Sequence, residues 1–198
     1  MTTAIPNTQV MNRAALTKRV VGKLTNREAV IGGIGNSNWD LWGAGHRDEN
    51  FYMLGSMGLA APIALGVAIA QPERKVIALE GDGSLLMQLG CLSTIAARKP
   101  ANLILVIWDN GIYQITGGQG TPAQLAGTDL IAIARASGLT NAQWAADEAE
   151  FDQLLDAALA TPGPHVIGAR IDNEPGRNQT DRDPVRFAQS FSRAMAAR

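Results

Sequence analysis

Cysteine, unbalanced charge and long apolar runs are all scarce in this 198-residue chain, and each scarcity excludes a class of protein. The single cysteine, Cys91, excludes an internal disulfide framework and is typical of a reducing compartment. The formal net charge of −1 gives no electrostatic reason to expect nucleic acid or an anionic membrane as a partner. The longest apolar run, from Leu59 to Ala70, is too short to cross a bilayer.

The N-terminal segment lacks the continuous apolar core of a signal peptide, because polar and basic residues are mixed throughout it. We therefore expect a cytoplasmic protein. Apolar residues make up 46% of the chain and charged residues 18%, which is typical of a globular protein of about one domain. We expect residues 1–27 to form a helical segment and residues 28–198 to form the domain.

Short apolar, β-branched runs alternate with helical ones along the chain. The runs at 75–80 and 102–110 are nearly all apolar, which is the pattern of strands buried on both faces. Alternation of strands with helices predicts an α/β fold with an open, mostly parallel sheet and helices on both faces. The predicted strands are 28–35, 75–80, 102–110, 141–146 and 165–170, and the predicted helices are 58–70, 84–99, 130–138 and 147–160.

The C-terminal stretch from Asp183 begins with Asp-Pro, which is a good start for a helix. Helical spacing places Phe187, Phe191 and Met195 on one apolar stripe. This stripe either covers the core of the same domain or docks on a second chain, and the sequence leaves both possibilities open.

Polar residues follow two of the predicted strands where each strand ends. Gly-Asp-Gly-Ser occupies 81–84, and Asp-Asn-Gly at 109–111 ends the next strand. Ligands bind at the carboxyl ends of strands in open parallel sheets, and one right-handed crossover should bring these two ends together. Asp82 and the amide oxygen of Asn110 would then be hard ligands of the kind that Mg²⁺ uses together with phosphate oxygens and water.

The backbone of the first motif offers a second kind of ligand. Gly83 and Ser84 expose N–H groups where a helix is predicted to begin, an arrangement that binds anions. A diphosphate bridged by the metal would satisfy both sites at once, and a side chain at Gly81 or Gly83 would hold the phosphate off. At the end of a strand, Asp82 is expected to be exposed rather than buried. A tight turn without any ligand is the alternative for either motif.

These motifs resemble those of thiamine-diphosphate-dependent enzymes, in which Gly-Asp-Gly, a helix and a strand are followed by asparagine. The family usually has two asparagines where this chain has Asp109 and Asn110. The stretches DNGIYQITGGQ (109–119) and FYMLGSMGLA (51–60) resemble the branch of sulfopyruvate and phosphonopyruvate decarboxylases. Within that branch the chain looks like the diphosphate-binding, β-type subunit of a split enzyme. The resemblance runs from about Glu28 to the end of the chain.

The resemblance implies a role for each matching residue. It implies that Asp82, Asn110 and the backbone carbonyl of Ile112 hold Mg²⁺. It also implies that Met57 supports thiamine diphosphate from below and keeps it bent for catalysis. The other implied cofactor contacts are Gly55, whose carbonyl accepts from the 4′-amino group, and Ser56, Gly81, Gly83, Ser84, Tyr113 and Thr116. The ordinary alternatives are that Met57 fills the core and that Tyr113 belongs to a flexible flap.

The resemblance also implies a reaction and a partner. In the family, a glutamate from a separate pyrimidine-binding domain protonates the cofactor, and this chain has no room for such a domain. We therefore expect an α-type partner subunit in a hetero-oligomer with at least two copies of each chain. The implied reaction is decarboxylation of a small 2-oxo acid, with sulfopyruvate or phosphonopyruvate as the leading substrate. No Cys-x-x-Cys pair is present for an iron–sulfur cluster, so the expected reaction is non-oxidative.

Other functions stay open at this point. Another thiamine-diphosphate-dependent lyase or carboligase subunit fits the same motifs, as does a non-catalytic module that binds the cofactor. A dinucleotide-binding oxidoreductase fits less well, since Asn38 stands where the third glycine of its fingerprint would be. His46 and Arg47 either reach an anionic substrate or form a solvated basic pair. We expect His165 to be structural and Cys91 to be a small buried apolar residue.

Overall fold

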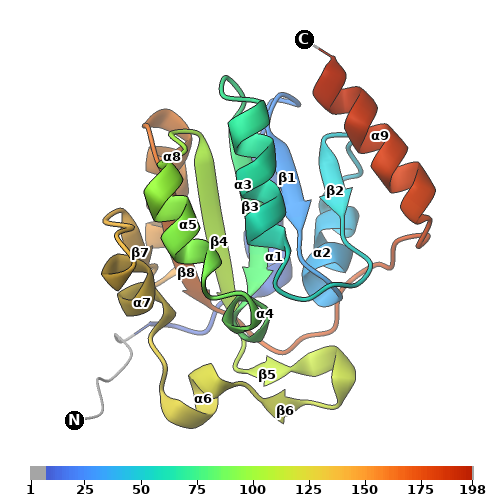
Figure 1. The fold of residues 1–198 in the computed structure, drawn as a ribbon. Helices are drawn as coiled ribbons and strands as arrows, with labels where there is room; N and C mark the ends of the chain where they lie inside the picture. The colour runs from blue at the N-terminus through green and yellow to red at the C-terminus, as the bar shows by residue number, and fades with distance from the viewer. Residues whose placement is uncertain (1–7, 198) are drawn as a thin grey trace.

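The computed structural model describes residues 8–197 and shows a six-stranded parallel sheet with helices on both faces (Figure 1). The strand order is β2-β1-β3-β4-β8-β7, and every neighbouring pair is parallel. The predicted α/β class is confirmed. The strands are β1 (Ala29–Gly32), β2 (Asn50–Tyr52), β3 (Val76–Gly81), β4 (Leu103–Asp109), β7 (Ala142–Trp144) and β8 (His165–Arg170).

The two central strands, β3 and β4, are apolar up to Glu80 and Asp109 near their carboxyl ends, because each of their faces is covered by helices. In the register Ala78 pairs with Leu105, and both side chains join the core on one face. Their neighbours Leu79 and Val106 join the core on the other face. The first face packs against α3 (Ala60–Ala70), α5 (Cys91–Arg98) and α7 (Leu130–Ala136), and the second against α1 (Arg13–Gly22), α2 (Asn36–Ala44) and α8 (Glu148–Ala160).

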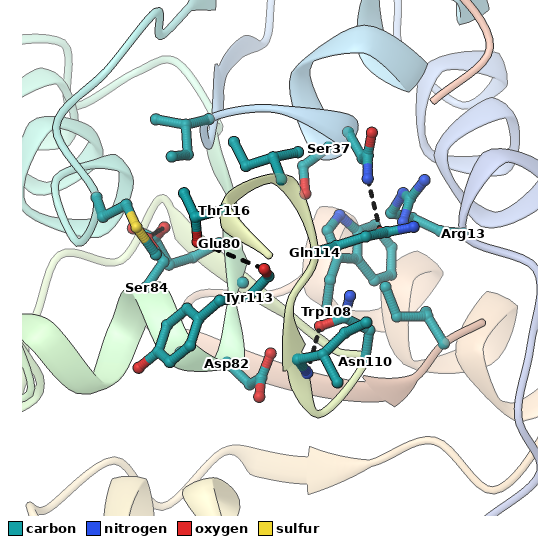
Figure 2. Close-up of a pocket in the computed structure, with 18 residues that line it drawn as sticks. Arg13, Ser37, Glu80, Asp82, Ser84, Trp108, Asn110, Tyr113, Gln114 and Thr116 are labelled. Atoms are coloured by element: carbon teal, nitrogen blue, oxygen red, sulfur yellow. Dashed lines mark hydrogen bonds between the residues drawn. The ribbon is translucent and has the colours of Figure 1, made fainter. Parts of the chain in front are cut away.

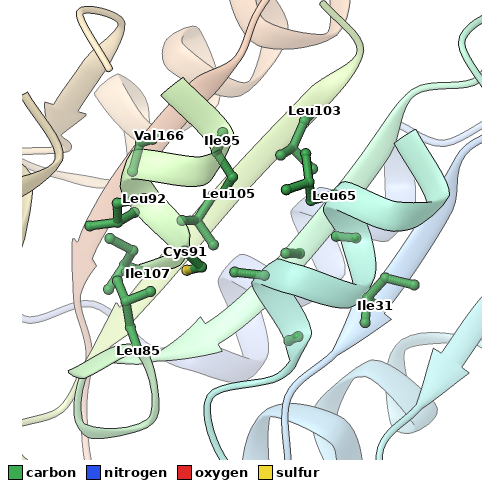
Figure 3. Close-up of a cluster of buried hydrophobic side chains, with 14 of the residues drawn as sticks. Ile31, Leu65, Leu85, Cys91, Leu92, Ile95, Leu103, Leu105, Ile107 and Val166 are labelled. Carbon is green, nitrogen blue, oxygen red and sulfur yellow. The ribbon is translucent and has the colours of Figure 1, made fainter. Parts of the chain in front are cut away.

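Cys91 lies in the first of these cores, among the side chains drawn in Figure 3. It is buried, and burial raises the pKa of its thiol to about 11. The interpretation of Cys91 as a small buried apolar residue is therefore confirmed. The most apolar helix, α3, spans 11 residues. No helix within residues 8–197 is both long and apolar enough to cross a bilayer.

The single helix predicted over 84–99 is wrong, because the structure has two helices there. They are α4 (Asp82–Met87) and α5, and the backbone of Gln88 between them leaves the helical conformation. Gly90, a poor helix former, precedes α5. The break turns the second helix so that Leu92 and Ile95 are fully buried on the sheet. Neither α2 nor β2 was predicted.

A small antiparallel hairpin follows β4 and lies beyond the carboxyl edge of the sheet (Figure 1). Its strands are β5 (Ile112–Tyr113) and β6 (Gln119–Gly120), and the turn between them contains the 3₁₀ helix η1 (Gln114–Thr116). The short helix α6 (Pro122–Ala126) comes next, and Thr121 caps its start. The hairpin therefore projects over the edge at which Asp82 lies.

Helix α1 packs into the core of the second face rather than lying apart from it. Leu16 and Val20 are fully buried there. Asn12 caps the helix by accepting a hydrogen bond from the N–H of Ala15 at 2.9 Å. The division of the chain at residue 28 stays a prediction.

The C-terminal helix α9 (Pro184–Ala196) lies beside β2, at the edge of the sheet (Figure 1). Phe187 and Phe191 are 3% and 8% exposed, and the ring of Phe191 lies 5.5 Å from that of Phe51 on β2. Met195 packs against the same core. Of the two possibilities for the apolar stripe, the structure shows that it covers the core of its own chain.

Replacing Phe191 with alanine is expected to lower the free energy of unfolding by about 3 kcal/mol, because the truncation leaves a cavity between α9 and β2. Val185→Ala on the same helix is the control, since Val185 is 63% exposed and should change stability by less than about 0.5 kcal/mol. Urea denaturation of both variants measures the difference. Equal stability of the two variants would contradict the packing of α9 described above.

Candidate functional site

A pocket lies at the carboxyl edge of the sheet, where β3 and β4 end (Figure 2). It is walled by the ends of these strands, by α4, by the hairpin and by the starts of α1 and α2. Gly55 and Ser56 do not line it and are exposed beside Met57. The other predicted site residues all line the pocket: Met57, Gly81, Asp82, Gly83, Ser84, Asn110, Ile112, Tyr113 and Thr116.

The register of the two central strands explains why Asp82 and Asn110 meet. Gly81 on β3 pairs with Trp108 on β4. Asp82 comes one residue after Gly81 and Asn110 two residues after Trp108, so both lie just beyond the same end of the paired strands. The Oδ1 atom of Asn110 accepts a hydrogen bond from the N–H of Ile112 at 3.2 Å, and an amide oxygen has a second lone pair. The sequence-based prediction that the two motifs lie together is therefore confirmed by the topology.

Asp82 is buried rather than exposed, so the expectation from its strand-end position is wrong. Its side chain is covered by Thr121, whose hydroxyl donates to Oδ2 at 2.6 Å. Burial, opposed by the hydrogen bond from Thr121 and reinforced by the neighbouring carboxylate of Asp109, raises the pKa of Asp82 to about 6. A cation beside Asp82 would offset this penalty.

The oxygen atoms around Asp82 suit a hard cation. Asp109 is 3% exposed, and burial raises its pKa, while Arg170 at 3.5 Å opposes that shift. No cluster of three histidine, cysteine, aspartate or glutamate side chains that could hold a metal occurs within residues 8–197. A cation here would therefore depend on one carboxylate, one amide and backbone carbonyls, with the remaining ligands from phosphate or water.

Gly83 has a structural requirement that the sequence did not indicate. A Cβ atom at this position would overlap the ring of Tyr113 and lie 2.7 Å from Cγ2 of Thr121. The hairpin and the start of α6 therefore pack directly on the backbone of α4. A Cβ at Gly81 would meet its nearest heavy atom, Cβ of Ser84, only at 3.8 Å. Close packing within the chain thus requires glycine at position 83, whether or not a phosphate approaches it.

Glu80 is a site residue that was not singled out from the sequence. It is 1% exposed, and burial raises its pKa. The hydroxyl of Ser84 donates to Oε1 of Glu80 at 2.5 Å and accepts from the N–H of Gly58 at 2.7 Å. The N–H groups of Ala60 and Ala61 donate to Oε2 at 2.9 and 3.3 Å. A lone carboxylate at the end of an apolar strand was the signal that could have revealed it.

This network fixes the loop that carries Met57. Gly58 follows Met57 directly and is held by Ser84, while the start of α3 is held by Glu80. Met57 is half-buried and lines the pocket. The hydroxyl of Ser84 is therefore used within the protein, so that any contact of Ser84 with a ligand would come from its backbone.

The side of the pocket farthest from Ser84 in Figure 2 is formed by residues that the sequence did not indicate. Arg13 is 2% exposed and donates from Nε to Asp40 at 2.8 Å and from Nη2 to the carbonyl of Glu174 at 2.7 Å. Asn36 donates from Nδ2 to Oε1 of Gln114 at 2.6 Å. No sequence signal marked Arg13, since its place in the pocket depends on how α1 packs.

His46 and Arg47 lie at the opposite, amino edge of the sheet. Arg47 donates from Nη2 to the carbonyl of Glu28, the residue before β1, at 3.0 Å, and its side chain is 8% exposed. Arg47 therefore does not reach the pocket to contact an anionic substrate there, and it is not part of a solvated basic pair. His46 is half-exposed and stacks on Tyr52. His165 begins β8 at the same edge, in keeping with a structural role.

Comparison with known proteins gives one family and several relatives. Residues 33–169 match the family described as "Thiamine pyrophosphate enzyme, C-terminal TPP binding domain". The chain is 41% identical over 167 residues to the sulfopyruvate decarboxylase subunit beta of Methanothermobacter thermautotrophicus, and the match covers 84% of each chain. It is 40% identical over 162 residues to the phosphonopyruvate decarboxylase of Streptomyces hygroscopicus, covering 82% of this chain and 40% of that protein.

The length of the match differs between these relatives. The chain spans about two fifths of the phosphonopyruvate decarboxylases that it matches, but most of the sulfopyruvate decarboxylase β subunit. Among solved structures, benzoylformate decarboxylase from Polynucleobacter necessarius matches with a TM-score of 0.68 at 21% identity, over 88% of this chain and 35% of that chain. That likeness shows the fold alone.

The buried carboxylate of Asp82 should destabilise the chain above about pH 6, and Asp82→Asn should relieve this. Below the ordinary pKa of 3.8 both folded and unfolded states hold the proton. Between 3.8 and about 6 the unfolded state ionises first, so stability falls as the pH rises; the full difference corresponds to at most about 3 kcal/mol.

The measurement is thermal unfolding of both proteins, without added metal, at about pH 4 and about pH 8. We expect Asp82→Asn to unfold at a higher temperature than the wild type at the higher pH and at nearly the same temperature at the lower pH. Asp181→Asn, at a half-exposed position outside the pocket, is the matched control. A variant that is less stable than the wild type at the higher pH would contradict this account of Asp82.

Proposed function

The chain belongs to the thiamine pyrophosphate enzymes as a C-terminal TPP-binding domain, and on this basis we propose that it is the diphosphate-binding subunit of a two-subunit 2-oxo acid decarboxylase. We propose sulfopyruvate or phosphonopyruvate as its substrate and the cytoplasm as its location. The observation that carries the proposal is the meeting of Asp82 and Asn110 in a pocket that also contains Met57. The high coverage of a decarboxylase β subunit supports the division into two chains.

We propose that Asp82, Asn110 and the carbonyl of Ile112 hold Mg²⁺. The raised pKa of Asp82 supports this, because a buried carboxylate with no cation beside it is destabilised. All three groups offer oxygen atoms at the same edge of the sheet, and Mg²⁺ commonly completes its shell with phosphate oxygens and water. The backbone N–H groups of Gly83 and Ser84, in the first turn of α4, would face the diphosphate.

The other residues of the pocket would orient the cofactor. Met57 would support its two rings, Gly55 and Ser56 would contact the aminopyrimidine, and Tyr113 and Thr116 would cover it from the hairpin. When bound, thiamine diphosphate supplies the electron sink for the loss of CO₂ from a 2-oxo acid. The network of Glu80 and Ser84 would keep Met57 in place during turnover.

A partner subunit would supply the proton-transfer glutamate. Glu80 is the only glutamate among the described residues that line the pocket, and both of its carboxylate oxygens already accept hydrogen bonds within the protein. An exposed apolar side chain in the pocket wall also favours a covering chain. Ile115 lines the pocket and is 47% exposed. We propose a pyrimidine-binding, α-type partner with at least two copies of each chain.

The proposal is tested by measuring CO₂ release from sulfopyruvate and from phosphonopyruvate, with Mg²⁺ and thiamine diphosphate. The chain alone should be inactive, because the glutamate comes from the partner, and a mixture with an α-type sulfopyruvate decarboxylase subunit should be active. The same mixture with Asp82→Ala should lose activity. Full activity of the chain alone would refute the need for a partner subunit. A mixture that releases CO₂ from another 2-oxo acid but from neither of these two would refute the substrate assignment.

The proposed role of Met57 separates turnover from binding. Met57→Ala should lower kcat at least about tenfold while changing the affinity for thiamine diphosphate only slightly, since the diphosphate anchor lies at Asp82. Met57→Leu keeps most of the bulk and should be milder. Val185→Ala, at a position that is 63% exposed and outside the pocket, is the control. An alanine variant with full turnover would mean that Met57 only fills space.

A further inference from the structure

One side of the pocket carries two hydrogen-bond donors for which the described residues offer no acceptor, and the one on Trp108 is buried. The indole Nε1 of Trp108 has no hydrogen-bond partner within residues 8–197, although the side chain is 1% exposed. Arg13 uses Nε for Asp40 and Nη2 for the carbonyl of Glu174, and within the same residues Nη1 makes no hydrogen bond. Both side chains line the pocket. A buried donor without an acceptor is costly, so this side of the pocket is built for a ligand that accepts.

The position of these donors follows from the alternation of side chains along the strands. Trp108 belongs to the core beneath α1 and α8, whereas Glu80 on β3 turns to the opposite face and bonds to the start of α3. The pocket therefore crosses the edge of the sheet from one face to the other. Figure 2 shows Ser84 and Glu80 on one side of the pocket and Arg13 and Trp108 toward the other, with Asp82 and Asn110 below them in this view.

The start of α2 adds donors to the side with Arg13. Asn36 and Ser37 form its first turn and line the pocket, and first-turn N–H groups have no acceptor within their own helix. Acceptors on this side are already occupied, since Oε1 of Gln114 takes the Asn36 amide and Asp40 takes Arg13 and the N–H of Arg177. A guanidinium, an indole N–H and a helix N-terminus together suit an anion with several acceptor oxygens.

We propose that Arg13 and Trp108 bind the terminal phosphate of thiamine diphosphate. This inference rests on the function proposed above, in which Met57 supports the rings and Asp82 and Asn110 hold the metal. The rings and the terminal phosphate are opposite ends of the cofactor. With the rings at Met57 and the metal at Asp82 and Asn110, the terminal phosphate would lie on the side of the pocket that carries Arg13 and Trp108. Arg13 lies outside residues 33–169, which match the family, so α1 contributes to the site from outside the matched domain.

The test is titration calorimetry of the full chain mixed with the α-type sulfopyruvate decarboxylase subunit and Mg²⁺, using thiamine diphosphate and thiamine monophosphate as the two probes. Trp108→Phe removes the N–H group and keeps an aromatic ring in the core, and Arg13→Gln removes the charge. Each variant should bind thiamine diphosphate at least about tenfold more weakly, whereas its affinity for the monophosphate should change less than about twofold.

Matched controls make the same substitutions away from the pocket. Trp144→Phe removes an indole N–H that donates to Asp129 at 2.9 Å, and Arg19→Gln removes an arginine on α1 that pairs with Glu148 and Asp152. Both controls should bind both probes like the wild type. If Arg13→Gln does not fold, because Asp40 loses its partner, Trp108→Phe alone decides.

Two results would overturn the inference while leaving the proposed function intact. One is wild-type affinity for thiamine diphosphate in Trp108→Phe and Arg13→Gln. The other is an equal loss of affinity for both probes, which would indicate general damage to the pocket rather than a missing phosphate contact. Failure of the wild-type chain to bind thiamine diphosphate even in the mixture with the α-type subunit would instead overturn the proposed function, and the inference with it.

Discussion

The hydrogen bonds of the buried Glu80 carboxylate hold the carboxyl edge of the sheet together. Burying a carboxylate costs several kcal/mol unless its oxygens are paired, and here the partners come from two neighbouring helix starts, one of which lines the pocket. Ser84 brings in the start of α4, and Ala60 and Ala61 bring in the start of α3. Through Ser84 the same bonds also reach the loop of Met57. The geometry of the candidate site therefore follows from the hydrogen bonds that the Glu80 carboxylate needs at the end of β3.

Much of the fold and the centre of the site could be predicted from the sequence, because they depend on local rules. The apolar runs identified the central strands, and the crossover rule brought Asp82 and Asn110 together. The family resemblance is confirmed. The roles of Arg13 and Thr121 could not be predicted, since each depends on which element packs against which. The exposure of Asp82 was mispredicted for the same reason, because Thr121 and α6 cover it.

The distance of His46 and Arg47 from the pocket has a simple geometric cause. They are close in sequence to Met57, but β2 lies between them and the loop that contains it. A strand in a parallel sheet carries the chain from the amino edge to the carboxyl edge, so residues before and after it lie at opposite edges. Proximity to a motif in the sequence is therefore a poor guide to the site unless the intervening strand is counted.

One wall of the pocket is assembled from segments that are far apart in the sequence. Met11 exchanges backbone hydrogen bonds with Arg170 and Asp172, and Arg13 bonds to the carbonyl of Glu174, 161 positions away. Contacts of such long range close a large loop, so this wall forms at a high entropic cost. A ligand that binds there binds only the closed arrangement, so its apparent affinity depends on the free energy of closing the junction. Cofactor affinity and the stability of this junction are therefore linked quantities, and a substitution that loosens the junction weakens binding without touching the ligand.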